Sequence, residues 1–277
     1  MALVPGTARL GTHGEVVIAT NLTSTIRDLH RRKARGRRGL ALVEGVRLVE
    51  EAQAAGLDVR GIVCSNEVER TTRGTDLRAQ LVAQGTPVQE VSAKLFRELA
   101  DTDTPQGIIA VVEPRLWTTA DLPTTGGVLL VIDGVQDPGN TGTLIRTAHA
   151  LGAAGTIALR GTADVWSPKA LRASMGATFR HPVVMLDDAA FITWAQRHGI
   201  TLWATAADGR PLQDALGSRS GREGPIAVIV GNEGAGIRPQ LNAIAALRVS
   251  IPMIPGAESL NVGVAAGILL YEVQRGR

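Results

Sequence analysis

The chain has 277 residues, of which 44% are hydrophobic and only 3% aromatic. This length suits one large or two modest domains, whose core must consist mainly of Val, Ile, Leu and Ala. A single cysteine, Cys64 in the apolar run GIVCS, excludes an internal disulfide and a cysteine-based metal site, and it predicts a small buried side chain. No apolar run approaches about 18 residues and no signal peptide is recognisable, so we expect a cytoplasmic protein that does not span a membrane.

Positive charge is concentrated in one short segment. The formal net charge is +3 and the isoelectric point is ≈ 9.6. Residues 27–38, RDLHRRKARGRR, hold seven Arg or Lys and one Asp, whereas the rest of residues 1–126 holds nine basic and fourteen acidic residues. Such clustering is typical of a surface that binds a polyanion, although a solvated basic helix or a disordered arm has the same composition.

The first half alternates between helical and strand patterns. Residues 1–20 fit no clear element and are predicted to be a flexible lead. A basic helix is expected within 21–39, followed by strands at 40–45, 59–65, 87–92 and 107–113 and helices at 46–56, 75–85 and 93–100. This alternation predicts a small α/β domain over 21–115. The Pro-, Thr- and Gly-rich stretch that follows predicts a linker over 116–126.

The second half, 127–277, has stronger strands and is predicted to be a separate α/β domain. The strands are expected at 127–133, 156–160, 182–186, 200–205, 225–230 and 247–251. Their continuous β-branched runs are typical of a parallel sheet covered on both faces. Ligands of such sheets sit at the carboxyl ends of the strands. The Gly- and Asn-rich segments 134–142, 231–236 and 252–261 fall at three of these ends.

The segment after the first of these strands is DGVQDPGNTGTLIRTAHALGA, residues 133–153. It lacks the Lys-Ser/Thr ending of a P-loop, and its glycines are not spaced as in a dinucleotide-binding loop. Arg146 points away from the apolar face of the predicted helix and is surrounded by small residues. It is either a solvated arginine or a guanidinium on a cleared surface that a phosphate or another subunit can approach. Asn140 could simply be an N-cap.

Two later segments share this Gly- and Asn-rich character. In VIVGNEGAGI, residues 228–237, a strand ends in glycines that permit close backbone approach, and Glu233 is either a site residue or a surface charge on a turn. In IPMIPGAESLNVGVAAGILLYE, residues 251–272, a Pro-rich loop leads through Ser259 and Asn261 into a helix. That helix is apolar nearly all round, which predicts burial on more than one side. Ser259 as an N-cap leaves Asn261 unexplained.

Together and in this order, the three segments resemble the signature motifs of the SpoU (TrmH) branch of the SPOUT RNA methyltransferases. They read DPGNTGTLIRTAxxLGA, VGNEGxG and IPMxxxxxSLNVxVAAGIxLYE, and RASMGATFRHPV at 172–183 resembles the family's linking segment. LVEGVRLVEEA and TDTPQGIIAVV resemble the family's L30e-like substrate-binding domain. The resemblance implies an α/β fold in which a parallel-sheet SPOUT domain with a trefoil knot follows a smaller L30e-like α/β domain.

The resemblance further implies methyl transfer from S-adenosylmethionine to a ribose 2′-hydroxyl of structured RNA. Ribosomal RNA is favoured over tRNA because of the separate first domain, and both a housekeeping and an antibiotic-resistance modification stay open. The residues that match the family's catalytic positions are Arg146, Asn140, Glu233, Ser259 and Asn261. By position, the cofactor is expected on Gly231, Ile251, Leu260, Thr205, Ala206, Asn232 and Met253. Gly263 stands where the family often has Ser.

The resemblance also bears on partners. Family members act as homodimers, and the small residues of helix 262–270 suit such an interface; no metal is expected. Phosphate contacts are expected from Arg27, Arg31, Arg32, Lys33, Arg35, Arg37 and Arg38. The main alternative is a non-catalytic RNA-binding or ribosome-assembly factor on the same scaffold, against which the intact motifs argue. A nucleotide-binding enzyme is disfavoured because no phosphate-binding lysine follows the Gly-rich loops.

Overall fold

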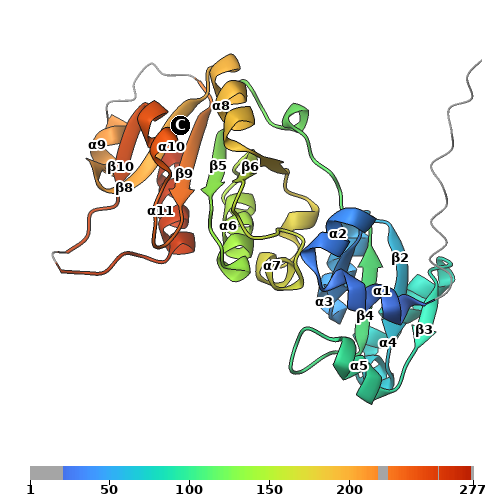
Figure 1. Ribbon diagram of the computed structural model, residues 1–277. Coiled ribbons are helices and arrows are strands. Elements are labelled where there is room, and N and C mark those ends of the chain that lie inside the picture. The colour runs from blue at the N-terminus through green and yellow to red at the C-terminus, as the bar shows by residue number, and fades with distance from the viewer. Residues whose placement is uncertain (1–20, 218–223, 255, 276–277) are drawn as a thin grey trace, which may run out of the picture.

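The computed structural model describes residues 21–217, 224–254 and 256–275, so the predicted lead over 1–20 lies outside the described residues. The chain forms two sheets, and Figure 1 shows them in two lobes that meet near α7 (Pro168–Ser174). We call the sheet of residues 41–112 with its helices the first domain. The sheet of residues 128–250 with its helices is the second domain.

The first domain is a mixed sheet with helices on both faces. Its strands are β1 (Ala41–Glu44), β2 (Val59–Cys64), β3 (Val88–Glu90) and β4 (Ile108–Val112), in the order β1-β4-β2-β3. β4 runs antiparallel to β1 and β2, whereas β2 and β3 are parallel. Helices α3 (Val46–Ala54) and α4 (Thr72–Ala83) pack on one face, and α1 (Leu22–Leu29) and α5 (Ala93–Leu99) pack on the other. A short 3-10 turn, η1 (Asn66–Arg70), precedes α4.

The expected single basic helix is instead two helices, α1 and α2 (Arg32–Arg38). α1 buries Leu22, Ile26 and Leu29, which recur at the spacing of one helix face. The sequence RKARGRR offers only Ala34 as an apolar residue and therefore cannot continue that face. The chain leaves the helical conformation at Arg31, whose φ of −88° and ψ of 129° are extended.

The second domain is a six-stranded sheet in which every pair of neighbours is parallel, as the sequence predicts. Its order is β10-β8-β9-β5-β6-β7, built from β5 (Val128–Asp133), β6 (Gly155–Leu159), β7 (Val183–Leu186), β8 (Thr201–Pro211), β9 (Ile226–Gly231) and β10 (Leu247–Ser250). The knot that the resemblance implies stays a prediction.

Helices cover both faces of this sheet. Alternate residues of β5 enter opposite cores: Val128, Leu130 and Ile132 on one side, Leu129 and Val131 on the other. The first core is closed by α6 (Pro138–Ala150), α9 (Leu212–Gly217) and α11 (Val262–Arg275). The second core is closed by α8 (Asp188–Arg197) and α10 (Pro239–Ile244). Such double coverage explains why these strands are apolar without alternation.

Strand β8 is longer than expected because it pairs with β10 in two registers. Arg248 lies opposite Ala204, but the next residue, Val249, lies opposite Arg210. The intervening residues 205–209 therefore bulge out of the ladder, and bulges of this kind re-aim side chains beside binding sites. This bulge contributes one wall of the pocket described below.

The two domains share part of a core. Leu171 of α7 and Phe179 are both fully buried, and both belong to the apolar cluster that α3, α4 and the first sheet form. Ion pairs surround this contact, including Arg180 with Glu51 at 2.7 Å. The segment around α7 thus packs between the domains, against α6 of the second domain and against the apolar cluster of the first.

Candidate active site

Three of the expected catalytic residues form a hydrogen-bonded cluster at the carboxyl ends of β5 and β9. Asn140 lies in the first turn of α6, where the N-cap residue Asp137 accepts a hydrogen bond from its backbone N–H at 2.8 Å. The Asn140 side chain donates from Nδ2 to Oε1 of Glu233 at 2.7 Å. Asn261 donates from its own Nδ2 to Oδ1 of Asn140 at 3.1 Å. We call these three side chains the polar cluster.

The chemistry of the partners fixes how both amides are turned. The carboxylate of Glu233 can only accept, so Asn140 must present its NH2 group to it and its oxygen to Asn261. Asn261 in turn accepts from the backbone N–H of Gly263 at 2.9 Å, which requires its own oxygen on that side. Asn140 is therefore more than the N-cap that sequence reasoning allowed. The N-cap role belongs to Asp137.

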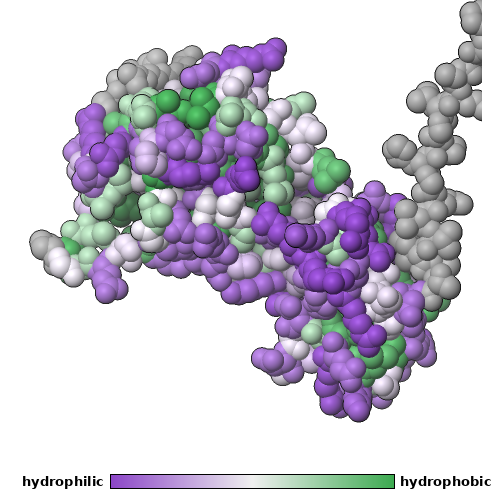
Figure 2. All heavy atoms as spheres, in the orientation of Figure 1, coloured by the Kyte–Doolittle hydropathy of each residue, from purple (hydrophilic) through white to green (hydrophobic). Residues whose placement is uncertain are grey.

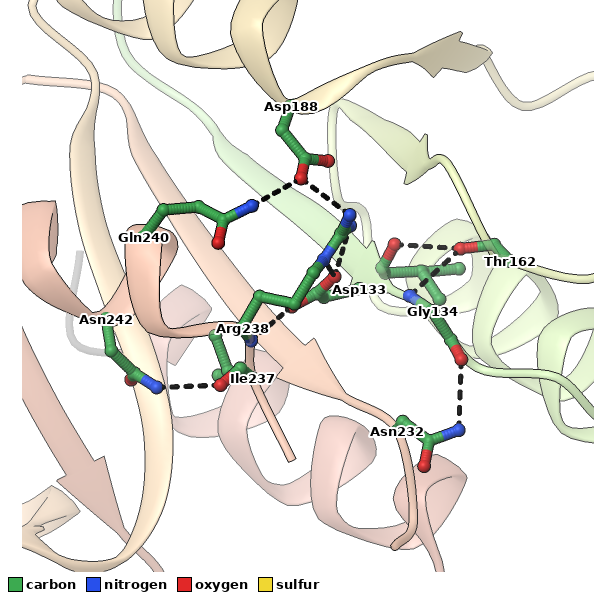
Figure 3. Close-up of polar contacts among 10 residues, drawn as sticks. Asp133, Gly134, Thr162, Asp188, Asn232, Ile237, Arg238, Gln240 and Asn242 are labelled. Carbon is green, nitrogen blue, oxygen red and sulfur yellow. Dashed lines mark hydrogen bonds and ion pairs between the residues drawn. The ribbon is translucent and has the colours of Figure 1, made fainter. Parts of the chain in front are cut away.

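A second network holds the loop that carries Glu233, and Figure 3 shows it. Asp133, the last residue of β5, is 1% exposed and accepts from the backbone N–H of Arg238 at 2.7 Å and from its guanidinium group. The same guanidinium donates to Asp188 at 2.6 Å. Sequence reasoning missed Asp133 and Arg238. The available signal was an acidic residue that ends an otherwise apolar strand, since a buried charge requires a partner.

Gly231 and Asn232, also expected at the cofactor, are not among the residues that line the pocket at β8 and β10. Asn232 donates to the backbone oxygen of Gly134 at 3.0 Å, which ties the loop after β9 to the loop after β5. A Cβ on Gly231 would lie 2.3 Å from the carbonyl carbon of Gly236, so the turn closes directly onto this residue. The glycine is explained by that closure.

The other expected cofactor residues do surround one pocket, of about 180 Å³. The bulge of β8 supplies Thr205 and Ala206, and the segment after β10 supplies Ile251 and Met253, while Ser259 and Leu260 precede α11. Ala207, Val249, Ser250, Ala265 and Leu269 complete the lining. Apolar walls with a few hydroxyl groups suit a ligand that has an aromatic base and polar ends.

Arg146 is exposed on α6 and has no side-chain partner among the described residues. Helical spacing suggested that the small residues near Arg146 leave a surface free for a phosphate or another subunit. The structure corrects this, because some of them pack against other helices. A Cβ on Gly142 would lie 2.3 Å from the backbone oxygen of Ala170, so α7 occupies that side of the helix. On the adjacent side, Thr143 and Thr147 contact Gly263 and Gly267 of α11. Arg146 itself remains exposed on α6, although its neighbours pack in this way.

The arginine-rich segment divides into bound and accessible side chains. Arg35 is 7% exposed, pairs with Asp164 of the second domain at 2.6 Å, and donates to two backbone oxygens. The expectation that Arg35 contacts RNA is therefore wrong, because the residue is a buried link between the domains. The other six expected residues are exposed: Arg27, Arg31, Arg32, Lys33, Arg37 and Arg38.

Three of these exposed arginines converge on one carboxylate. Arg31, Arg37 and Arg38 pair with Asp28, and their hydrogen bonds and charge lower the pKa of that group. Figure 2 shows a hydrophilic surface over α2. The described residues contain no group of three or more His, Cys, Asp or Glu placed to hold a metal ion. Within the same residues, no helix is long and apolar enough to cross a membrane.

Fold and site together define a two-domain α/β protein in which a pocket and a polar cluster meet at the carboxyl ends of a parallel sheet. The chain belongs to the SpoU rRNA Methylase family, whose profile matches residues 127–271. Residues 24–110 match the MRM3-like substrate binding domain. The family expectation from the sequence motifs is confirmed.

Individual relatives agree with this assignment. The chain is 36% identical over 252 residues to the 23S rRNA (guanosine(2553)-2′-O)-methyltransferase RlmP of Bacillus subtilis, covering 90% of this chain and 94% of the relative. The crystal structure of AdoMet-bound rRNA methyltransferase from Sinorhizobium meliloti has a TM-score of 0.79 at 32% identity, covering 93% of this chain and 95% of that one. AviRb from Streptomyces viridochromogenes, in complex with AdoMet, has a TM-score of 0.78 at 30% identity, covering 91% and 96%.

Proposed function

We propose that the protein is an S-adenosylmethionine-dependent methyltransferase that acts on a ribose 2′-hydroxyl of ribosomal RNA. One observation carries the proposal: Ser259 and Leu260 line the pocket, and the next residue, Asn261, bonds Asn140. Leu260 of the pocket lining is thus followed directly in the chain by a residue of the polar cluster. The relatives support the reaction, because RlmP is named as a 23S rRNA 2′-O-methyltransferase and two structural neighbours hold AdoMet.

The residues that line the pocket fit this cofactor. Ile251, Leu260 and Leu269 offer apolar surface for the adenine ring, and the hydroxyl groups of Thr205 and Ser259 offer hydrogen bonds to polar parts of the ligand. When bound, S-adenosylmethionine supplies a methyl group activated by its sulfonium. Gly231 and Asn232 do not line this pocket, and they fix the loop after β9, which carries Glu233.

The chain's own groups orient the reaction. The fixed chain of amides from Asn261 through Asn140 to Glu233 presents polar atoms in one defined arrangement, so the 2′-hydroxyl can be positioned without reorganisation of the site. Arg146 is exposed and carries five N–H donors and no acceptor, so it suits contact with an RNA phosphate rather than uptake of a proton.

Transfer of labelled methyl groups to RNA tests the function. The wild-type protein is incubated with labelled S-adenosylmethionine and bacterial 23S rRNA that lacks the modification. We expect incorporation to fall about 100-fold or more in Arg146→Ala, since misplacement of a reacting group has effects of that size. Cofactor binding should be retained, because Arg146 does not line the pocket. Arg197→Ala, an exposed arginine on α8, is the matched control.

Each other outcome has a definite meaning. Wild-type incorporation by Arg146→Ala would contradict the role given to that residue. Labelling of tRNA instead of rRNA would correct the substrate. No labelling of either RNA by the wild-type protein would favour the non-catalytic RNA-binding factor on the same scaffold.

The homodimer is part of the proposal and has support on α11. Val264, Ile268 and Tyr271 recur at the spacing of one helix face and are 52%, 37% and 52% exposed, so they form an apolar stripe open to solvent. Ile268→Glu is expected to give a monomer in sedimentation experiments. Val82→Glu, at an exposed apolar residue of the first domain, should leave the dimer intact. A dimer that survives Ile268→Glu would contradict this interface.

A further inference from the structure

A hollow in the first domain is lined by cationic side chains from separate segments. It has a volume of about 450 Å³ and lies between the start of α3, the turn η1 with the start of α4, and the loop before β4. Arg47, Arg70 and Arg73 line it together with Gln106. All three arginines are exposed, so their guanidinium groups can be reached from solvent.

Two of these arginines carry charge that no other described group neutralises. Arg73 donates to both carboxylate oxygens of Glu50. Glu67, the acidic residue in the lining, pairs with Arg97 at 3.3 Å. The guanidinium groups of Arg47 and Arg70 have no partner among residues 21–217, 224–254 and 256–275. The hollow is therefore cationic, and guanidinium groups in such a position suit the oxygens of a phosphate.

This hollow continues toward the second domain. Arg47 and Gln106 also line a second hollow, of about 200 Å³, whose opposite side is formed by Arg172 and Met175 at the end of α7. Arg172 donates to Asp101 at 2.6 Å, which holds the loop before β4 against α7. Met175 is 39% exposed and offers an apolar contact to a base. Figure 1 shows α7 beside α3, the helix that carries Arg47.

Helix α7 leads from these hollows to the polar cluster. Lys169, near its start, donates to Asp137 at 2.6 Å, and Asp137 is the residue that caps the backbone N–H of Asn140. The Lys169 ammonium and the Asn140 N–H together lower the pKa of Asp137. α7 has seven residues and spans about 10 Å at 1.5 Å per residue. The second hollow, which adjoins the cationic one, and the polar cluster thus lie at the two ends of one short helix.

We propose that the ribose-phosphate backbone of the rRNA substrate binds in the hollow of Arg47 and Arg70 and continues along α7 to the polar cluster. This inference rests on the proposed function and names the surface that holds its substrate. Phosphate contacts of this kind fix the register of a nucleic acid without reading its sequence. Their role here is to hold the RNA so that one ribose lies at Asn140.

The arginine-rich segment is a separate surface, so the two can be tested independently. It begins in the last turn of α1, which covers the opposite face of the first sheet from α3 and α4. Part of its charge is already used by Asp28 and Asp164. Arg27 and Arg32 are its exposed arginines without a side-chain partner among the described residues.

Salt-dependent binding of 23S rRNA tests the inference. The dissociation constant is measured from low to high KCl for the wild-type protein, Arg47→Gln/Arg70→Gln and Arg27→Gln/Arg32→Gln. A matched control, Lys94→Gln/Arg197→Gln, removes the same charge from exposed residues of α5 and α8. Loss of two phosphate contacts should reduce the slope of log K against log [KCl] by about 1.4 to 1.8. We expect this reduction in Arg47→Gln/Arg70→Gln and none in the control.

Cofactor binding and thermal unfolding of the same variants show whether each variant is folded. An unchanged slope and affinity in folded Arg47→Gln/Arg70→Gln would overturn the inference, and so would an equal change in the control. Failure of the proposed function is a different result, because it appears as absent methyl transfer by the wild-type protein. A reduced slope in Arg27→Gln/Arg32→Gln as well would add the arginine-rich segment to the RNA surface and leave the inference in place.

Discussion

The network of Asp133, Arg238 and Asp188 makes a quantitative prediction about the loop that carries Glu233. In Arg238→Ala, Asp133 keeps the bond from the backbone N–H of residue 238 but loses the guanidinium group. A carboxylate that is 1% exposed is then left without a countercharge. Removal of one partner from a buried ion pair costs about 3–5 kcal/mol. We expect the lower end, about 3 kcal/mol of the free energy of unfolding, because one hydrogen bond remains.

Asp188→Ala is the matched comparison. It removes the other carboxylate from the same guanidinium, but Asp188 has a side chain 21% exposed, and Arg238 keeps Asp133 as its partner. A half-exposed pair of this kind contributes about 1 kcal/mol. Urea unfolding, followed by tryptophan fluorescence to which the buried Trp194 and Trp203 contribute, measures both variants. Equal losses in the two variants, or a loss below about 1 kcal/mol in Arg238→Ala, would refute the reasoning.

Three further predictions concern stability. Burial, and to a lesser extent the charge of a nearby histidine, lowers the pKa of His181 from 6.5 to about 4. As the pH falls, His181 therefore takes up its proton at a lower pH in the folded protein than in the unfolded chain. Stability is full above pH 6.5 and should fall by about 2 kcal/mol at pH 5, a dependence that His181→Gln flattens in urea titrations at several pH values. Gly142→Ala should cost about 1–3 kcal/mol because its Cβ meets the backbone of α7, whereas the Cβ of Gly234→Ala meets only Oδ1 of Asn232 at an ordinary 3.6 Å; similar melting temperatures of the two would contradict this. Phe179→Ala should lower the free energy of unfolding by about 3–5 kcal/mol and expose the first domain to proteolysis, and unchanged cleavage would argue against the shared core.

Local patterns were enough to predict most of the sheet framework. Runs such as VLLVID in β5 predicted buried parallel strands, because both faces of that strand enter a core. Because ligands of parallel sheets bind at the carboxyl ends of the strands, the sequence also predicted where the Gly- and Asn-rich segments meet. Asn140, Glu233 and Asn261, which are far apart in the chain, are indeed hydrogen-bonded to one another.

Apart from the basic helix, which breaks at Arg31, the predictions that were wrong concern contacts between distant surfaces. Helical spacing shows that Gly142 shares a side with Arg146, but spacing alone does not reveal that α7 covers that side. Likewise, composition identified a basic segment but could not show that Arg35 turns inward to Asp164. The same limit applies to Asp133 and Arg238, which are 105 residues apart and whose pairing no local pattern announces.

The shared core also bears on the order in which the chain is made. The first domain lacks Leu171 and Phe179, which complete its apolar cluster, until the ribosome has synthesised the start of the second domain. The last strand of the first sheet ends at Val112, 67 residues before Phe179. Synthesis of this stretch takes roughly 3 to 13 s at about 5–20 residues per second. During that interval the emerging domain presents an unfilled apolar surface, a form in which nascent chains associate with chaperones or with one another. A protein excised at the boundary between its domains would keep that unfilled surface permanently.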